Sequence, residues 1–145
     1  MRRVALSIAI GLSVSACSSA RRPPEFLGQG SNASRPLSTA ARSNGFLFVS
    51  GQLGTDSTGR VVAGGIQPET RQALTKLRAI LEQHGLAMDR VVKCTVFMLD
   101  MKEFAAMNEA YITFFAAGKR PTRSTVGVSG LAGNGRVEIE CLAQG

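Results

Sequence analysis

The sequence has few of the residues on which most catalytic mechanisms depend. It contains no tryptophan, one tyrosine, one histidine (His84) and three cysteines among 145 residues. With a single histidine it holds neither a Ser-His-Asp nor a Cys-His arrangement, and no His and Cys residues at metal-ligand spacing. A phosphate-binding G-x-x-x-x-G-K-[ST] loop is also absent. An enzyme built from this chain would rely on arginine, carboxylates, hydroxyl groups, backbone amides and water, without a metal or a cofactor.

Acidic residues are also scarce relative to basic ones. The chain has 17 lysines and arginines against 10 aspartates and glutamates, a net charge of +7 at pH 7. Such a charge attracts nucleic acids, anionic lipids and small acidic ligands alike. The arginines are scattered and aromatic residues do not alternate with them, so we expect no nucleic-acid partner. The charge alone does not identify an acidic ligand.

The N-terminus has the layout of a bacterial lipoprotein signal. Two arginines precede an apolar stretch, residues 4–14, that is shorter than the roughly 18 residues a transmembrane helix needs. Residues 14–17 resemble a lipobox, which implies cleavage just before Cys17 and a diacylglycerol thioether on that cysteine. With Ser18 next, we expect a lipid anchor in the cell envelope, in the outer membrane and facing the periplasm. A buried N-terminal helix is the alternative.

The chain divides into three parts. Residues 1–16 are the predicted signal peptide. Residues 17–35, which begin with the acylated cysteine, are rich in Ser, Pro, Gly and Asn, so they predict a flexible tether. The remainder, residues 36–145, is long enough for one domain with a hydrophobic core and too short for two.

Hydrophobic patterns predict five strands in this domain. Residues 46–53 are rich in β formers, and after a turn-rich segment residues 61–65 form a short returning strand, so these two predict a hairpin. Residues 89–99 are apolar almost without interruption, which predicts a strand buried on both faces. The last two expected strands are residues 125–128 and 137–143.

Two segments have helical spacing of their apolar residues. The first is residues 68–84, and His84 at its end is interpreted as a partner of the helix dipole, not as a catalytic residue. The second helix follows Asp100, the expected N-cap, with Glu103 at the capping-box position. Its predicted inner stripe is Phe104, Met107, Tyr111 and Phe114.

The order β-β-α-β-α-β-β predicts an α+β domain of two layers, a mixed sheet with two helices on one face. On the last strand, alternation places Val137, Ile139 and Cys141 on one face of the sheet. Glu138 and Glu140 then lie on the other face, where carboxylates are costly to bury alone. We therefore expect this face to turn toward a subunit interface that holds water, ligand and arginine.

Cys94 and Cys141 lie in apolar, strand-like segments. We interpret both as small buried hydrophobic residues. A disulfide between them is the alternative, because an envelope compartment would permit one. The sequence does not give the distance between the two cysteines, which would decide the matter.

Four segments taken together resemble sequences of the RidA/YjgF family. They are VSGQLG (49–54), the segment 91–115, RPTRSTVGV (120–128) and VEIECLA (137–143). The resemblance implies a chorismate-mutase-like fold and a homotrimer with a ligand cleft between its subunits. It also implies the hydrolysis of reactive 2-imino acids or enamines to 2-keto acids and ammonia.

The resemblance implies roles for individual residues. Arg123 corresponds to the arginine that pairs with the substrate carboxylate, and Glu138 to the carboxylate near the attacking water, so these two are the expected catalytic residues. Leu37 stands near the position of a tyrosine found in many deaminating members of the family. The expected substrate-binding residues are Ser50, Gly51, Asn108 and Thr125, the last at a position where cysteine is common.

The chemistry of these residues fits the implied reaction. The planar guanidinium of Arg123 matches a carboxylate through two parallel hydrogen bonds, and Pro121 restricts the backbone just before it. A protonated imine is already electrophilic, so orienting the substrate and one water would supply much of the rate. Glu138 is the candidate for ordering that water or accepting its proton.

Each assignment has a structural alternative. Arg123 can form an interfacial ion pair with Glu138 or Glu140. Asn108 can cap the end of a strand, and the pair Ser50–Gly51 can be a bulge. For the whole protein, two alternatives to a deaminase stand: a non-catalytic module that binds small carboxylates, and a chaperone-like holdase with exposed apolar surface.

Overall fold

The structure is a computed structural model that describes residues 22–28 and 36–145. The predicted signal peptide and the predicted lipidation site, Cys17, lie outside the described residues. None of the helices in the described ranges combines the length and the apolar character that a bilayer crossing requires.

One six-stranded sheet forms the frame of the domain, in the order β1-β2-β3-β6-β4-β5. Neighbouring strands are antiparallel except β4 and β5, which are parallel and joined through a helix. The strands are β1 (Glu25–Leu27), β2 (Ala40–Ser43), β3 (Phe46–Leu53), β4 (Val91–Met98), β5 (Thr122–Gly127) and β6 (Val137–Gln144).

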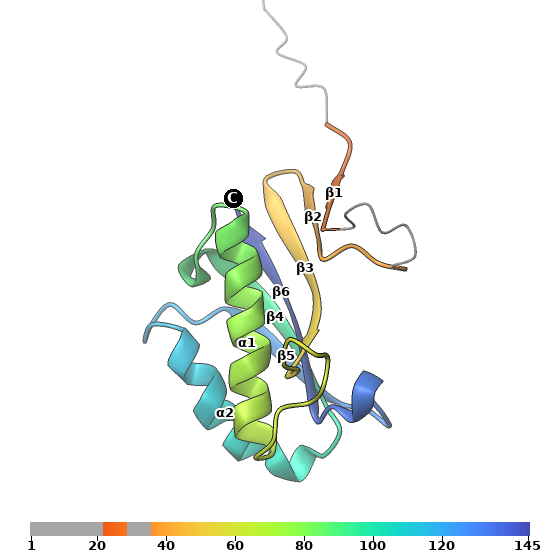
Figure 1. Cartoon of the computed structure of the whole chain (residues 1–145). Helices are drawn as coiled ribbons and strands as arrows, with labels where there is room; N and C mark the ends of the chain where they lie inside the picture. The colour runs from red at the N-terminus through yellow and green to blue at the C-terminus, as the bar shows by residue number, and fades with distance from the viewer. Residues whose placement is uncertain (1–21, 29–35) are drawn as a thin grey trace, which may run out of the picture.

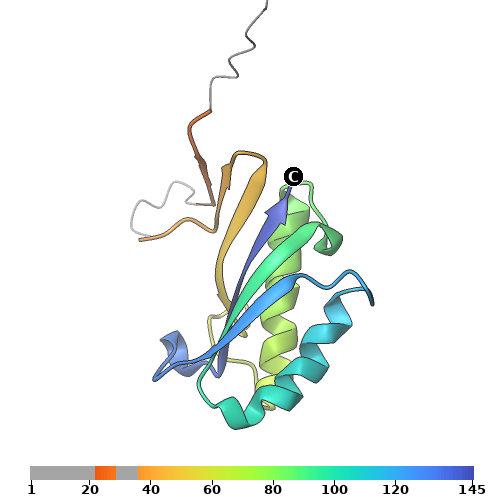
Figure 2. The same cartoon turned by 180° about the vertical axis from the view of Figure 1, so that it is seen from behind.

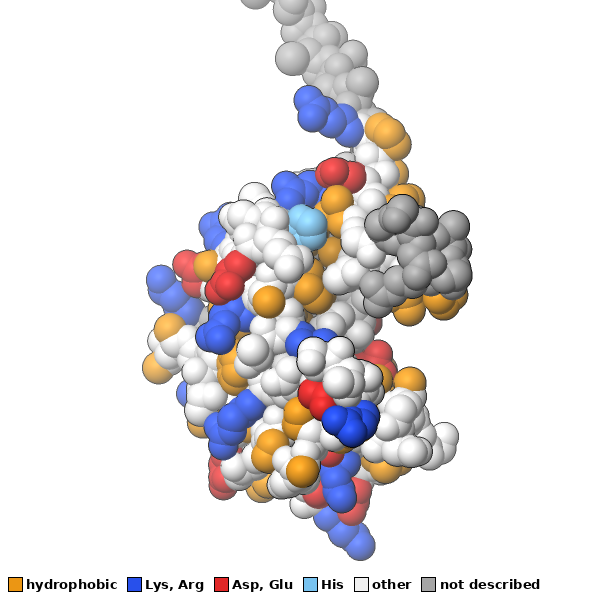
Figure 3. All heavy atoms as spheres, viewed as in Figure 1, with side chains coloured by type: hydrophobic (Ala, Val, Ile, Leu, Met, Phe, Trp, Pro, Cys, Tyr) orange, Lys and Arg blue, Asp and Glu red, His pale blue; other side chains and the backbone are white. Residues whose placement is uncertain are grey.

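Two helices, α1 (Ile66–Gln83) and α2 (Phe104–Tyr111), lie on the same face of the sheet (Figures 1 and 2). This arrangement confirms the predicted two-layer α+β fold. His84 is the C-cap of α1, at the helix end where it is expected. On the helix-bearing face shown in Figure 3, basic side chains are interspersed with acidic and apolar ones over the described residues.

The hairpin predicted from residues 46–53 and 61–65 is wrong. Strand β3 pairs with β2 and β6, and residues 61–65 contribute only an isolated bridge between Val61 and Thr55. The hairpin that does form is β2–β3. Its turn has Asn44 at φ 49° and Gly45 at φ 78°, the two positive values that a tight type I′ turn requires.

Strand β1 lies inside the segment 17–35 that is predicted to be a flexible tether. Residues 25–27 pair with β2, and the amide of Thr39 donates a hydrogen bond to the carbonyl of Leu27 at 2.9 Å. The sheet therefore begins before residue 36, and for these three residues the predicted tether is wrong.

The core lies between the sheet and the helices. Alternate residues of β4 and β6, among them Val96, Met98 and Ile139, are fully buried against leucines of α1. The expected burial of both faces of β4 does not occur within one chain, because Lys93 on the opposite face is exposed. The predicted orientation of β6 is confirmed, since its odd-numbered residues from 137 to 143 are buried and its even-numbered ones are not.

A network of charged groups joins the two helices to the start of β6. Asp100 accepts a hydrogen bond from the amide of Lys102, as an N-cap should, but Glu103 does not complete a capping box. Instead Glu103 pairs with Arg136 at 3.1 Å, and Arg136 also donates its backbone amide to the buried Glu69 at 2.8 Å. Burial raises the pKa of Glu69, while the hydrogen bond and charge of Arg136 oppose that rise.

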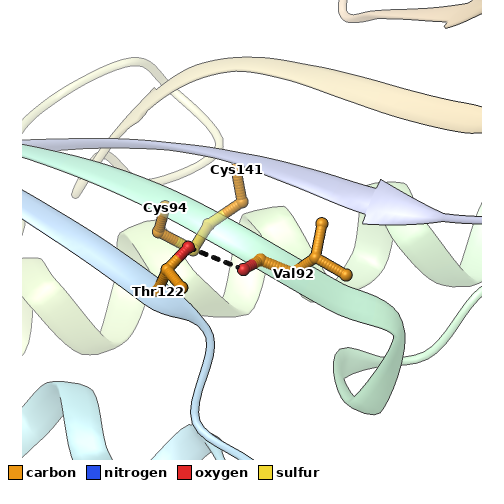
Figure 4. The surroundings of a disulfide bond; sticks show 4 residues. All are labelled: Val92, Cys94, Thr122 and Cys141. Carbon is orange, nitrogen blue, oxygen red and sulfur yellow. Dashed lines mark hydrogen bonds between the residues drawn. A yellow bond between two sulfur atoms is a disulfide. The ribbon is translucent and has the colours of Figure 1, made fainter.

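Cys94 and Cys141 form a disulfide (Figure 4), so the favoured interpretation of two separate thiols is wrong. The register of β4 and β6 places the two residues directly opposite each other, with their Cα atoms 4.1 Å apart. Next to the bridge, the hydroxyl of Thr122 donates to the carbonyl of Val92 at 2.9 Å and joins β5 to β4. The two central strands are thus linked covalently.

Removing the bridge should lower the stability of the folded state. We expect the double variant Cys94→Ala/Cys141→Ala to lose about 2–4 kcal/mol of unfolding free energy, because the cross-link restricts the unfolded chain. Urea unfolding under non-reducing conditions measures the loss. In the presence of a strong reductant the wild type should unfold like the double variant. Identical non-reducing curves for the two proteins would contradict the bridge.

Candidate functional site

The predicted site residues, together with two aromatic residues of α2 that were not predicted, fall into two groups on the structure. The first, here called the arginine cluster, consists of Arg123 and Thr125 on β5 and three residues of α2, namely Phe104, Asn108 and Tyr111. The second, here called the carboxylate cluster, consists of Glu138 on β6 and the Ser50–Gly51 pair on β3.

Strand β5 aims Arg123 and Thr125 at the helical layer. The two residues are two positions apart and therefore share a face of the strand. Their neighbours in the parallel ladder, Cys94 and Val96, are fully buried beneath the helices. Both Arg123 and Thr125 are half-buried, as an edge strand beside a short helix allows.

Helix α2 meets Arg123 with two aromatic rings. Phe104, Asn108 and Tyr111 are spaced by four and three residues, so they lie along one face of the helix. The guanidinium carbon of Arg123 is 4.6 Å from the ring centroid of Tyr111 and 5.7 Å from that of Phe104, within cation–π range. Burial raises the pKa of Tyr111 to about 12 despite the positive charge of Arg123, so the phenol is neutral at physiological pH.

The guanidinium of Arg123 is held by these rings and not by an acid. Among the residues that the structure describes, it has no hydrogen-bond acceptor and no carboxylate within salt-bridge distance. The alternative ion pair with Glu138 or Glu140 therefore does not form within the chain. The N–H donors of a half-buried arginine remain available to an anionic group.

Three polar atoms of the same cluster are buried without a hydrogen-bond partner. They are Oδ1 of Asn108, the hydroxyl oxygen of Tyr111 and Oγ1 of Thr125, and no other buried side-chain nitrogen or oxygen in the described ranges lacks a partner. An unpaired buried polar group costs about 1–3 kcal/mol. Such atoms are rare in folded proteins and concentrate at functional sites. The alternative role of Asn108 as a strand-end cap is not supported, because its carbonyl oxygen accepts no bond.

The carboxylate cluster is built on an irregularity of β3. The register of β3 with β6 shifts between Val49 and Gln52, so Ser50 and Gly51 do form the bulge that the sequence left open. The Glu138 carboxylate packs against Gly51, and a Cβ atom there would collide with its oxygen. The bulge and the glycine together give Glu138 its place.

Ser50 already has a structural partner. Its hydroxyl donates to the carbonyl of Ser38 at 2.7 Å. This bond fixes the segment that contains Leu37, whose side chain is 51% exposed. Leu37, which is expected near the position of the tyrosine, therefore lies in the segment that Ser50 holds beside the carboxylate cluster.

A single chain does not bring the two clusters together. Glu138 pairs with Phe97, whereas Arg123 pairs with Cys94, three residues earlier in β4. Strand β4 lies between the two strands, which separates them by two interstrand spacings of about 4.8 Å each. Glu138 also lies on the open face of the sheet, while Arg123 faces the helices.

Sequence reasoning missed Tyr111 and Phe104 as site residues. Both were assigned to the inner stripe of the second helix, and Tyr111 is indeed almost fully buried, with 3% of its surface exposed. The signal present in the sequence is their placement on either side of Asn108 at helical spacing. Without the partner strand, that spacing cannot be told from ordinary core packing.

Gly51→Ala should destabilise the fold by about 0.5–1 kcal/mol, since the added methyl group must displace the carboxylate end of the flexible Glu138 side chain. Gly130→Ala is the matched control, because a Cβ atom at Gly130 meets nothing within 4 Å and its φ is not in the left-handed region. Thermal unfolding of the two variants measures the difference. Equal stability of the two would show that Glu138 does not rest on Gly51.

Several known proteins resemble this chain in sequence. A family model described as Endoribonuclease L-PSP matches residues 29–144. A RutC family protein of Pyrococcus horikoshii is 43% identical over 109 residues, which are 74% of this chain and 86% of that protein. A mouse protein named 2-iminobutanoate/2-iminopropanoate deaminase is 41% identical over 109 residues, 74% of this chain and 80% of its own length.

A solved structure of similar sequence has the same fold. The crystal structure of Escherichia coli TdcF with bound serine is 33% identical in sequence and superposes with a TM-score of 0.72. The match covers 77% of this chain and 90% of that one. The two layers and the helix placement described above are thus also those of a structure that holds a small amino acid.

Proposed function

This chain belongs to the RidA/YjgF family, the family of the Endoribonuclease L-PSP model, and from that premise we propose that it hydrolyses reactive 2-imino acids or their enamine tautomers. The products would be 2-keto acids and ammonia. Relatives named imine deaminases in mouse, goat and cattle, 38–41% identical to this chain, support the proposal.

The observation that best supports the proposal is the environment of the Arg123 side chain. A half-buried guanidinium, stacked on Tyr111 and without an acid partner in the described part of the chain, is a ready receptor for a carboxylate. Its planar fork can form two parallel hydrogen bonds to both oxygens of such a group. The unpaired atoms of Asn108 and Thr125 in the same cluster support a ligand with further polar groups.

The complete site would need two copies of the chain. Since Arg123 and Glu138 lie on opposite faces of the sheet, the arginine cluster of one subunit would meet the carboxylate cluster of its neighbour. Such a head-to-tail contact closes into a ring, and a homotrimer is the assembly expected for this family. The open sheet face supports this assembly, because Phe48 on it is 49% exposed and would be covered.

The proposed reaction needs no strong nucleophile. Arg123 would hold the substrate carboxylate while water adds to the carbon of the protonated imine, and Glu138 would orient that water and accept its proton. Glu138 would then return the proton to the amino nitrogen, so that the adduct expels ammonia and the hydroxyl group loses its proton to water as its oxygen becomes the keto oxygen. Positioning the substrate and one water in this way converts a bimolecular attack into an effectively intramolecular one.

Arg123→Ala should lower kcat/KM for an imine generated in situ by an amino-acid oxidase at least about 100-fold, a loss of about 2.7 kcal/mol. Arg123→Lys should fall between this variant and the wild type, because it keeps the charge and loses the fork. Arg120→Ala, which removes an exposed arginine three residues away, is the control and should leave the rate unchanged. Equal rates for wild type and Arg123→Ala would end the deaminase proposal.

A non-catalytic module that binds small carboxylates is the second candidate, and the expected absence of the family tyrosine near Leu37 favours it. Such a module would bind a 2-keto acid through Arg123 and turn over no imine. A chaperone-like protein would differ from both, since its suppression of aggregation would survive Arg123→Ala.

For the location of the protein we propose a lipid anchor on Cys17 in the cell envelope. The Cys94–Cys141 disulfide supports this location, because disulfides persist in oxidising compartments and are rare in the cytosol. Cys17→Ser should release the full-length protein from membranes into the soluble fraction, as followed by fractionation. Cys17 is far in sequence from the bridge, so the variant should keep its disulfide. Unchanged membrane association would argue against lipidation.

A further inference from the structure

The rings that hold Arg123 differ in exposure and support. Tyr111 is buried, and Phe115 packs against it at a centroid distance of 4.9 Å with the ring planes tilted by 39°. Phe104, at the other end of the same helix face, is 36% exposed and lies at the rim of the cluster. The guanidinium thus contacts a buried ring that is itself packed against another ring, and a second ring that meets solvent.

We propose that Phe104 and Tyr111 form an aromatic platform that positions Arg123 for carboxylate binding, so that both are positioning residues of the proposed site. The inference rests on the proposed function, since it concerns the same arginine, and it adds how that arginine is kept ready. Neither ring needs to touch the substrate for this role.

An aromatic platform achieves what a carboxylate partner cannot. An arginine fixed by Asp or Glu is oriented, but its charge is balanced and part of its hydrogen-bonding fork is occupied. A ring face orients the guanidinium plane through stacking and cation–π attraction, and leaves the N–H groups at its edge free. The two ring contacts of Arg123 therefore hold its guanidinium in place of an acid, and they leave its N–H groups free for a ligand.

The platform also reduces the entropy lost when the ligand binds. A free arginine side chain has several rotatable bonds, and a ligand that must immobilise it binds more weakly. Stacking on Tyr111 and Phe104 restricts the side chain before the ligand arrives. The substrate class that benefits is a small, singly charged planar carboxylate, which meets an undivided positive charge and an oriented fork.

Tyr111 contributes through its ring face. Its hydroxyl lies buried without a partner among the described residues, and its high pKa keeps the phenol neutral, so no ion pair with Arg123 forms. Removal of the hydroxyl should therefore be tolerated, whereas removal of the ring should not. This difference separates positioning by the platform from a role of the hydroxyl in chemistry.

The test measures two quantities for each variant: the Kd for pyruvate, which is the simplest 2-keto acid, and the kcat and KM for imine hydrolysis. Phe104→Leu should weaken pyruvate binding and raise KM by about two- to fivefold, with kcat within about twofold of wild type, as loss of one cation–π contact implies. Because Phe104 lies at the rim, the folded state should persist, as thermal unfolding will show.

Two further variants sharpen the test. Tyr111→Phe should match wild type within about twofold in Kd and KM, while Tyr111→Leu should weaken both by about tenfold or more. Phe114→Leu is the matched control, since Phe114 makes the same kind of contact at the same 5.7 Å with Arg78, outside the two clusters. It should leave Kd and KM unchanged.

The outcomes distinguish the two proposals. If the wild type binds pyruvate and Phe104→Leu and Tyr111→Leu bind it equally well, the platform has no positioning role. If Tyr111→Phe loses kcat with an unchanged KM, the hydroxyl acts in chemistry and the inference is overturned. If the variants weaken pyruvate binding as expected but no protein hydrolyses imines, the platform stands and the deaminase proposal fails.

Discussion

The stacking of Arg123 on Tyr111 is the contact from which the rest of the candidate site takes its form. Among the described residues, it lets an edge strand present a charged group to a short helix without an acid to balance it. A half-buried positive charge of this kind is tolerable because the ring faces offer partial compensation and one side of the group reaches solvent. The unpaired polar atoms of Asn108, Thr125 and Tyr111 belong to the same arginine cluster. Together they outline a polar candidate binding surface that a second copy of the chain would complete.

The sheet separates the two halves of the site. Glu138 belongs to a central strand and is fixed by a glycine in the neighbouring bulge, whereas Arg123 belongs to an edge strand and is fixed by a helix. Glu138 and Arg123 are therefore each positioned by their own neighbours, and the geometry of neither depends on the other. A second copy of the chain would thus bring together two surfaces that are already ordered, at little further loss of conformational freedom.

Much of the fold was predictable because its signals are local. The alternation of β6 placed Ile139 inward and Glu138 outward, and helical spacing located both helices close to their observed bounds. The β2–β3 hairpin was missed although its signal, Asn44–Gly45, is also local; the turn residues after β3 were given more weight. Strand β1 is only three residues long and follows two prolines, so the composition of its segment predicted a flexible tether instead of a strand.

The candidate site was predictable only in part, for a different reason. The resemblance to a family supplied Arg123, Glu138, Gly51 and Asn108, and the structure places Arg123 against two aromatic rings and Glu138 against Gly51. Tyr111 was overlooked because a ring that packs under an arginine and a ring in the core have the same sequence pattern. The disulfide was only the alternative because the sequence does not give the distance between Cys94 and Cys141, and the register that joins them is a property of the folded sheet.

That cross-link has a consequence for how the folded chain would respond to a proteolytic cut. The chain between Cys94 and Cys141 includes α2 and β5, so the whole arginine cluster is carried on a covalently closed loop. Part of this loop, residues 129–134, lies at the surface. A protease that cut there would produce two fragments still joined through sulfur, because β6 on one fragment would stay bonded to β4 on the other. The chain could then be cut in this surface segment while β4 and β6 remain paired.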